Sequence, residues 1–423
     1  MRAHLRLLTQ ASRSLHNFIY EFIRFIAAKS GYLHPLSVVD MDSRTEQRIS
    51  LSAFFFLSGF CFSSWAARIP TIKTAFGFNE AELGTILLAM PISSLIGLPF
   101  SGWLITKFDS RVPLSFAFVL YAICLALISF ANSTATLVGA IFLFAFCMRI
   151  LNISMNTQAI TLQRHFDRKI NGSFHGLWST GGIVGVGYTT LMVAMDIPIT
   201  THLLSVSVLA VLSTLVCYRF LLRNDKSATG NKLALGKPDP YILYLGLLVF
   251  FAAICEGGMF DWSGIYFQEV VRVDIFTSGY LVFMAFMALS RFLSDRIIDR
   301  IGMPATYVLS ALFIFSGIGL ATLVPSFWPA MVGFSLVGFG TAAVIPMTYS
   351  LAGASKKYSP GMAISIIATY GIVGMLIGPP MIGYLAHAFN LRVSFIAFAF
   401  AGFMFIPISK LFFRREAQWA AAG

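Results

Sequence analysis

Charged residues are scarce in this sequence. Asp, Glu, Lys and Arg together make up 11% of the 423 residues, whereas soluble domains carry about 25%. Hydrophobic residues reach 57%, so the chain has too few charges to cover the surface of a water-soluble protein. The composition therefore excludes an ordinary soluble domain and favours a protein whose main solvent is lipid.

Signatures of catalysis and of metal binding are also missing. No P-loop, nucleophile elbow, kinase signature or metal-spaced His/Cys set is present. The five cysteines lie inside apolar runs without a short paired spacing. ATP-driven transport and hydrolysis are therefore poorly supported, and we expect neither an enzyme nor a bound cofactor or metal.

Long apolar runs are what the sequence does have. A helix needs about 20 mostly apolar residues to cross the hydrocarbon, and such runs recur from residue 50 onwards. The first six are predicted at 50–67, 83–105, 113–131, 136–158, 173–195 and 199–221. The second six are predicted at 241–260, 277–294, 304–323, 328–350, 361–385 and 393–413. We therefore expect an all-α membrane protein with twelve transmembrane helices.

A hydrophilic stretch divides these helices into two sets. Residues 222–240 are rich in Lys, Asn, Asp, Ser and Gly and are predicted to form a cytoplasmic linker. The linker separates an N-terminal six-helix half (41–221) from a C-terminal six-helix half (241–423). Residues 1–40 precede them as a basic segment, which is either an amphipathic helix on the inner leaflet or an extension upstream of a true start at Met41.

The net charge of +12 comes from basic residues, many of which lie in the predicted loops on one side of the membrane. With both termini in the cytoplasm, the cytoplasmic loops carry Lys107, Arg111, Arg164, Arg168, Lys169, Arg223, Lys226, Lys232, Lys237, Arg296, Arg300, Lys356 and Lys357. The opposite loops carry Arg68, Lys73, Arg272 and Arg392. This asymmetry obeys the positive-inside rule, so it indicates topology in an inner membrane rather than nucleic-acid binding.

The two halves share a loop motif. The loop after the second span reads SGWLITKFDSR (101–111), and the loop after the eighth reads SDRIIDRIGMP (294–304). Aligning Lys107 with Arg300 gives an offset of 193 residues, which is close to half of the chain counted from Met41. The sequence therefore predicts two pseudo-symmetric repeats of six helices.

This pair of loops resembles the signature of the major facilitator superfamily. The second copy matches at Asp299 and Arg300, whereas the first keeps Gly102, Lys107 and Arg111. Thr106 stands where the family places an acid, and Asp109 stands where it places a glycine. The resemblance implies that Gly102, Lys107, Arg111, Asp299 and Arg300 form a conformational gate. The alternative is that the basic side chains only anchor the loops at the inner surface.

Further segments are similar to the YbjJ-type bacterial permeases, a branch of that superfamily near the sugar-proton symporters. They are SSWAARIPTIK (63–73), LNISMNTQAITLQR (151–164), SFHGLWSTGG (173–182), EGGMFDWSGIY (256–266) and YGIVGMLIGPPMIG (370–383). The resemblance covers nearly all of the chain after Met41. It implies twelve helices and transport of a solute, without naming the solute.

We single out three charged residues in or beside the predicted spans, because a charge at the centre of a membrane costs about 2.5–3.5 kcal/mol. They are Arg149, Glu256 and Asp261. Glu256 lies ~22 Å into the seventh span, and we interpret it either as a proton-coupling or substrate-binding acid or as a structural partner of Arg149. Asp261 would face the same way as Glu256 only if Gly257 and Gly258 unwound the helix.

Other polar and aromatic residues complete the predicted substrate- and proton-binding set. Asn152 and Asn156 share a helical face with Arg149, which suggests an anionic or hydroxyl-rich solute. Trp178 and Tyr370 could stack on a sugar ring or simply pack. Trp65 and Trp262, at outer span ends, are predicted to anchor the protein at the membrane interface.

These patterns predict a monomeric transporter that moves a small, sugar-like solute by alternating access with protons as the coupling ion. The partners expected are the solute, protons and the lipid bilayer, with no nucleic acid. Two alternatives stay open. One is a drug or metabolite efflux pump of the same fold, which a Met-rich lining would suit. The other is a membrane sensor that binds solute without moving it.

Overall fold

The computed structural model describes residues 43–166, 170–225, 240–355, 357–358 and 360–422. The segment predicted at 1–40 and most of the predicted linker lie outside these ranges. Every regular element within them is helical. The first half comprises α2 (Ser43–Ala66), α3 (Ile69–Phe76), α4 (Glu80–Leu87), α5 (Ala89–Lys107), α6 (Arg111–Phe130), α7 (Thr134–Gln163), α8 (Asn171–Ala194), α9 (Ile199–Cys217) and η1 (Tyr218–Phe220).

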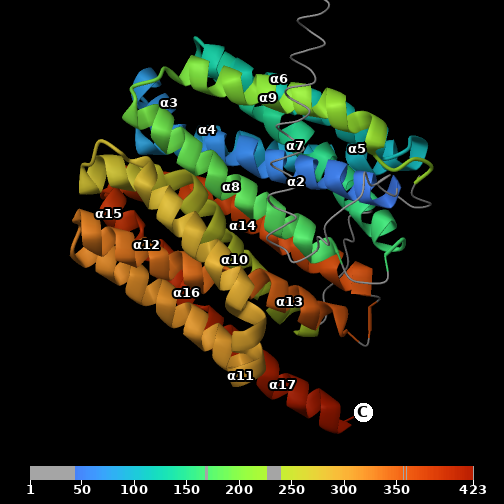
Figure 1. Cartoon of the computed structure of the whole chain (residues 1–423). Coiled ribbons are helices and arrows are strands. Elements are labelled where there is room, and N and C mark those ends of the chain that lie inside the picture. Colours follow the sequence, from blue (N-terminus) through green and yellow to red (C-terminus); the bar gives the residue numbers. More distant parts are fainter. Residues whose placement is uncertain (1–42, 167–169, 226–239, 356, 359, 423) are drawn as a thin grey trace, which may run out of the picture.

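The second half follows the linker. It comprises α10 (Pro240–Tyr266), η2 (Phe267–Val271), α11 (Thr277–Leu323), α12 (Phe327–Thr341), α13 (Val344–Gly353), α14 (Pro360–Ala388), α15 (Leu391–Ser394), α16 (Ile396–Phe403) and α17 (Phe405–Ala422). In Figure 1 the blue-to-green helices α2–α9 lie in the upper part of the bundle and the yellow-to-red helices α10–α17 in the lower part. We call these groups the N-terminal and C-terminal halves.

Within the described residues, eleven helical segments are long and apolar enough to cross a membrane, judged by length and composition. One of them, α11, has 47 residues, which is about 70 Å of helix and twice the thickness of a bilayer. Gly302 interrupts it with φ 77° and ψ 161°, a conformation open essentially to glycine alone. Divided at Gly302, α11 supplies the eighth and ninth spans, so the predicted twelve spans are confirmed.

The alternation of spans gives the bundle two ends. The linker end carries the start of α2, the Gly302 turn, the loop between α5 and α6, and the end of α17. The far end carries α3, η2, α15 and the loop between α8 and α9. All descriptions below use these two names.

Glycines bring pairs of helices into backbone contact. A Cβ atom at Gly181 of α8 would lie 1.9 Å from the carbonyl oxygen of Phe56 in α2, and one at Gly185 would lie 2.6 Å from that of Phe60. The C-terminal half repeats the arrangement, because a Cβ at Gly374 of α14 would lie 2.4 Å from the carbonyl oxygen of Phe250 in α10. Small residues allow such close packing in lipid, and the first and fifth spans therefore pack as the seventh and eleventh do.

We predict that Gly181→Ala destabilises the protein, because the added methyl group would collide with the backbone of α2. Overpacking of this kind costs about 1–3 kcal/mol. The measurement is the melting temperature of the purified protein in detergent. Gly187→Ala is the matched control, since nothing lies within 4 Å of a Cβ at that position of the same helix. Equal melting temperatures for the two variants would contradict the packing.

Candidate functional site

Glu256 forms an ion pair inside the membrane, and its partner is Arg291. The Nη2 atom of Arg291 in α11 donates to Oε1 of Glu256 in α10 over 3.0 Å. The two side chains are 31% and 11% exposed, respectively. The interpretation that pairs Glu256 with Arg149 is therefore wrong, because a neighbouring helix of the same half supplies a nearer cation.

Arg291 also reaches the other half of the protein. Its Nη1 atom donates to Oγ of Ser179 in α8 over 2.8 Å, and Ser179 is buried. One guanidinium thus holds a carboxylate of the C-terminal half and a hydroxyl of the N-terminal half.

Sequence reasoning missed Arg291, although a signal for it was available. The residue falls within the eighth span predicted at 277–294, yet it was not counted among the intramembrane charges. It lies 14 residues after Thr277, which is ~21 Å of helix from the far end. That depth is close to the ~22 Å counted for Glu256 from the linker end, so it marks Arg291 as a further charge inside the membrane.

Arg149 belongs to a different set of contacts. Its Nε atom donates to Oγ of Ser94 in α5 over 2.7 Å. The phenol of Tyr349 in α13 interacts electrostatically with both Arg149 and Glu256. These three side chains come from α7, α13 and α10, so the structure brings polar groups of the fourth, tenth and seventh spans near one another. We call Arg149, Glu256, Arg291 and Tyr349 the central polar cluster.

Asn152 and Asn156 extend the polar face of α7 towards the linker end. The amide of Asn156 donates to the side-chain oxygen of Asn152 over 3.1 Å and to its backbone oxygen over 2.8 Å. The predicted common face of these two residues is therefore correct. Asn152 is exposed, so its own amide group remains accessible.

The expected unwinding at Gly257 and Gly258 is not observed. Helix α10 runs without a break from Pro240 to Tyr266. A Cβ at Gly258 would lie 2.3 Å from the ring of Phe398 in α16, so this glycine admits an aromatic ring rather than bending the helix. Asp261 is half-buried and interacts electrostatically with Tyr280 of α11, nearer the far end.

Two of the predicted aromatic residues occupy different places. Trp178 in α8 is half-buried, with its ring 6.0 Å from that of Phe62 in α2. Phe62 in turn meets Phe260 of α10 at 5.7 Å, so Trp178 lies close to the boundary between the halves. Tyr370 packs within the C-terminal half, where a Cβ at Gly246 would lie 2.7 Å from its ring.

Trp65 and Trp262 do not form an interfacial belt. Both side chains are buried, and their indole Nε1 atoms have no hydrogen-bond partner among the described residues. The prediction of membrane anchoring for these two residues is therefore wrong. Both rings are core residues that pack below the far end of the bundle.

Contacts between the halves gather at the far end. Nζ of Lys73 in α3 bonds to Glu80 of α4 over 3.0 Å and to Glu269 of η2, which belongs to the other half. Hydroxyl pairs add further bonds across the boundary. They are Thr190 with Thr277 at 2.8 Å, Thr85 with Tyr384 at 3.0 Å, and Ser63 with Tyr280 at 3.3 Å.

The predicted gate residues lie at the linker end without such contacts. Lys107 packs over the ring of Trp103 and Arg111 over that of Tyr218, both within the N-terminal half. Asp299 and Arg300 are exposed. Among the described residues, none of these four side chains bonds to the opposite half, and Gly102 is buried in α5.

The two copies of the loop motif also differ in backbone conformation. Gly302 has a positive φ, whereas Asp109, its counterpart at the offset of 193 residues, does not. An Asp side chain could not adopt the conformation of Gly302 without strain. The departure from the family pattern at Asp109 therefore changes the shape of the loop. A hollow of about 520 Å³ beside it is lined by Lys107, Phe108, Asp109, Val112 and Asn224.

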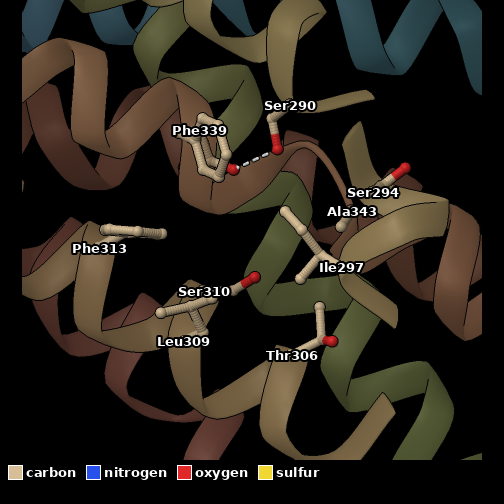
Figure 2. Close-up of a pocket in the computed structure, with 9 residues that line it drawn as sticks. All are labelled: Ser290, Ser294, Ile297, Thr306, Leu309, Ser310, Phe313, Phe339 and Ala343. Atoms are coloured by element: carbon tan, nitrogen blue, oxygen red, sulfur yellow. Dashed lines mark hydrogen bonds between the residues drawn. The ribbon is translucent and has the colours of Figure 1, made fainter. Parts of the chain in front are cut away.

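A second, much smaller cavity lies inside the C-terminal half (Figure 2). It is bounded by the parts of α11 before and after Gly302 and by α12. Ser290 on its wall donates to the backbone oxygen of Phe339 over 2.8 Å. Its volume is about 10 Å³, which has room for about one water molecule. It is too small for an organic solute, so it is not a candidate for the solute site.

Comparisons with known proteins agree with this architecture. The sequence model of the Major Facilitator Superfamily matches residues 51–353. An uncharacterised MFS-type transporter of Yersinia pestis is 31% identical over 351 residues, which cover 82% of this chain and 91% of that protein. The membrane protein MosC of Rhizobium meliloti is 30% identical over 389 residues, covering 90% of this chain and 94% of the relative.

Solved structures show the same fold at low identity. A bacterial homologue of the human lysosomal transporter Spinster, in an inward-facing and unoccupied conformation, aligns with a TM-score of 0.66 and 15% identity, covering 89% of this chain and 99% of that one. The nucleoside transporter NupG aligns with a TM-score of 0.67 and 13% identity, covering 88% and 99%.

We predict that Glu256→Gln and Arg291→Met are energetically coupled. Each single change leaves one member of the pair without its partner, whereas the double variant removes both. Residues in direct contact show coupling energies of about 0.5–3 kcal/mol. The measurement is the unfolding free energy in detergent from denaturant titration. Asp261→Asn combined with Arg291→Met serves as the control and should be additive; additivity in the test pair would exclude the ion pair.

Proposed function

This chain belongs to the Major Facilitator Superfamily, and we propose that it is a secondary active transporter. It moves a small polar, sugar-like solute by alternating access, and protons are the coupling ion. It acts as a monomer in the bacterial inner membrane with both termini in the cytoplasm. The single observation that carries the proposal is the ion pair between Glu256 and Arg291, in which Arg291 also donates a hydrogen bond to Ser179 of the opposite half.

Glu256 is the proton-binding acid in this proposal. Its carboxylate is stabilised by Arg291 while it is ionised. A proton bound to Glu256 removes that charge and weakens its attraction for the guanidinium. Arg291 can then break its hydrogen bond to Ser179 more easily. Proton binding in the C-terminal half thereby alters a contact with the N-terminal half, which is what coupling requires.

The state described here is closed at the far end. The Lys73 ion pairs and the hydroxyl bonds join the halves there. With the linker end in the cytoplasm, this is an inward-facing state. Alternating access then requires the far-end bonds to break while contacts form at the linker end. Lys107, Arg111, Asp299 and Arg300 supply charges for that second set of contacts, and Gly102 allows the helices to approach.

The solute binds between the halves in this proposal. Asn152 and Asn156 offer hydrogen bonds from α7, and Trp178 offers a ring face near the boundary. Asp261 of α10 and Tyr370 of α14 are the candidate contacts from the C-terminal half. Arg149 of the central polar cluster shares α7 with both Asn residues, and Arg291 bonds to Ser179, the residue next to Trp178, so solute and proton can affect the same side chains.

We predict that Glu256→Gln loses accumulation driven by an inward-directed pH gradient but keeps solute exchange at equal pH, because the amide cannot exchange a proton. The measurement is radiolabelled uptake into proteoliposomes, with sugars, sugar acids and amphipathic cations as the panel. Asp274→Asn, at an exposed acid in the far-end loop, should behave as wild type.

The same panel separates the alternatives. Full pH-driven accumulation by Glu256→Gln would remove Glu256 from the coupling role. Transport of lipophilic cations alone would favour an efflux pump. Binding of a solute without net flux by the wild type would favour a sensor.

We also predict that a cross-link between Thr190→Cys and Thr277→Cys blocks transport, because it fixes the far end in the closed state. Their hydroxyl oxygens are 2.8 Å apart across the boundary. The measurement is uptake before and after oxidation in a background without native cysteines, and reductant should restore activity. Ser133→Cys with Thr136→Cys, a pair 3.0 Å apart within one half, is the control. Unchanged uptake by the cross-linked test pair would argue against movement at the far end.

A further inference from the structure

The two arginines of the central polar cluster differ in how their charge is balanced. Arg291 is paired with Glu256. Arg149 bonds through Nε to the neutral hydroxyl of Ser94, and within the described ranges it forms no ion pair. The cluster therefore holds two guanidinium groups against one paired carboxylate, and the excess positive charge resides on Arg149.

The position of Arg149 is fixed by its neighbours. A Cβ atom at Gly97 of α5 would lie 3.2 Å from Cβ and 3.3 Å from Cγ of Arg149, so the stem of the side chain packs against bare helix backbone. The bond to Ser94 holds the Nε edge of the guanidinium. Its two terminal nitrogens keep their donors for another ligand, and such a planar fork matches carboxylate and phosphate oxygens.

The other polar residues associated with this cation are neutral donors. Tyr349 of the C-terminal half interacts with it electrostatically, and the exposed Asn152 lies nearly one turn along the same helix. A phenol and an amide can donate to an anion, but neither balances a full positive charge. An isolated charge within a membrane is costly, so an anion that enters the site is attracted by a positive charge that no side chain of the described protein balances.

We infer that Arg149 binds an anionic group of the transported solute, so that the solute is a polar organic acid such as a sugar acid rather than a neutral sugar. The inference rests on the proposed function, since it names the solute class of the same site. The anionic group binds at α7, and the hydroxylated remainder extends towards Tyr349 and the C-terminal half. A solute held in this way contacts both halves at once, which gives it a means of biasing their arrangement.

The test compares acids with neutral sugars of the same skeleton. The probes are glucuronate against glucose and galacturonate against galactose, with glucose 6-phosphate and inorganic sulfate added to sample other anions. Dissociation constants are measured by calorimetry on the full-length protein in detergent, and each ligand-induced melting shift is referred to the same variant without ligand. That reference separates loss of binding from loss of stability.

We expect an organic acid of the panel to bind wild type more tightly than its neutral counterpart. Arg149→Gln should weaken that binding by at least about 30-fold, because truncating one partner of a buried charge pair has effects of this size. Arg149→Lys should recover part of the affinity, since it restores the charge without the fork. Arg223→Gln, at an exposed cation in the described start of the linker, should bind as wild type.

Three outcomes would overturn the inference. They are a neutral sugar binding more tightly than its acid, an acid bound equally by wild type and Arg149→Gln, and no anion of the panel stabilising wild type more than Arg149→Gln. Binding of sulfate alone, without any organic acid, would reduce Arg149 to an inorganic anion site and would likewise reject the proposed solute class.

These failures are distinct from failure of the transport proposal. Uptake of a neutral sugar that is unaffected in Arg149→Gln would leave the transporter intact and reject the anionic solute. An acid that binds through Arg149 but shows no flux in proteoliposomes would keep the anion site and reject transport.

Discussion

The guanidinium of Arg291 bonds at once to Glu256 in its own half and to Ser179 in the other. A bilayer interior offers little water to stabilise a lone charge, so Glu256 depends on this one partner. The same cation therefore connects the charge state of an acid to the relative position of two six-helix bodies. The proposed coupling mechanism depends on this double role, because no other ion pair is described at that depth of the membrane.

Packing within each half restricts where movement can occur. The backbones of α2 and α8 meet at Gly181 and Gly185, and those of α10 and α14 meet at Gly374. Helices in such contact cannot slide far past each other without collision. Close backbone packing therefore holds the helices of each half together. At the boundary between the halves, hydroxyl and ion-pair contacts accompany a similar approach of Gly383 in α14 to α4, where a Cβ would lie 2.4 Å from the carbonyl oxygen of Glu80.

The fold could be predicted from the sequence because span length, loop charge and the loop repeat can be identified without knowing how the helices pack. The partners of individual side chains could not be predicted, because they depend on how each helix is rotated against its neighbours. The depth of Arg291 within its predicted span could be counted from the sequence, whereas its bonds to Glu256 and Ser179 could not. The role of Gly258 required Phe398, which lies far along the chain and fills the space that the glycine leaves. The burial of Trp262 likewise depends on packing that hydropathy does not describe.

The bonds that close the far end are mostly between neutral hydroxyl groups, such as Thr190 with Thr277 and Thr85 with Tyr384. A bond of this kind contributes only about 0.5–1.5 kcal/mol net, since water replaces it when it breaks. These hydroxyl bonds therefore add little free energy to the contacts that join the halves at the far end. In the proposed transport cycle, a single bound molecule or one protonation event would therefore be enough to shift the balance between a closed and an open far end.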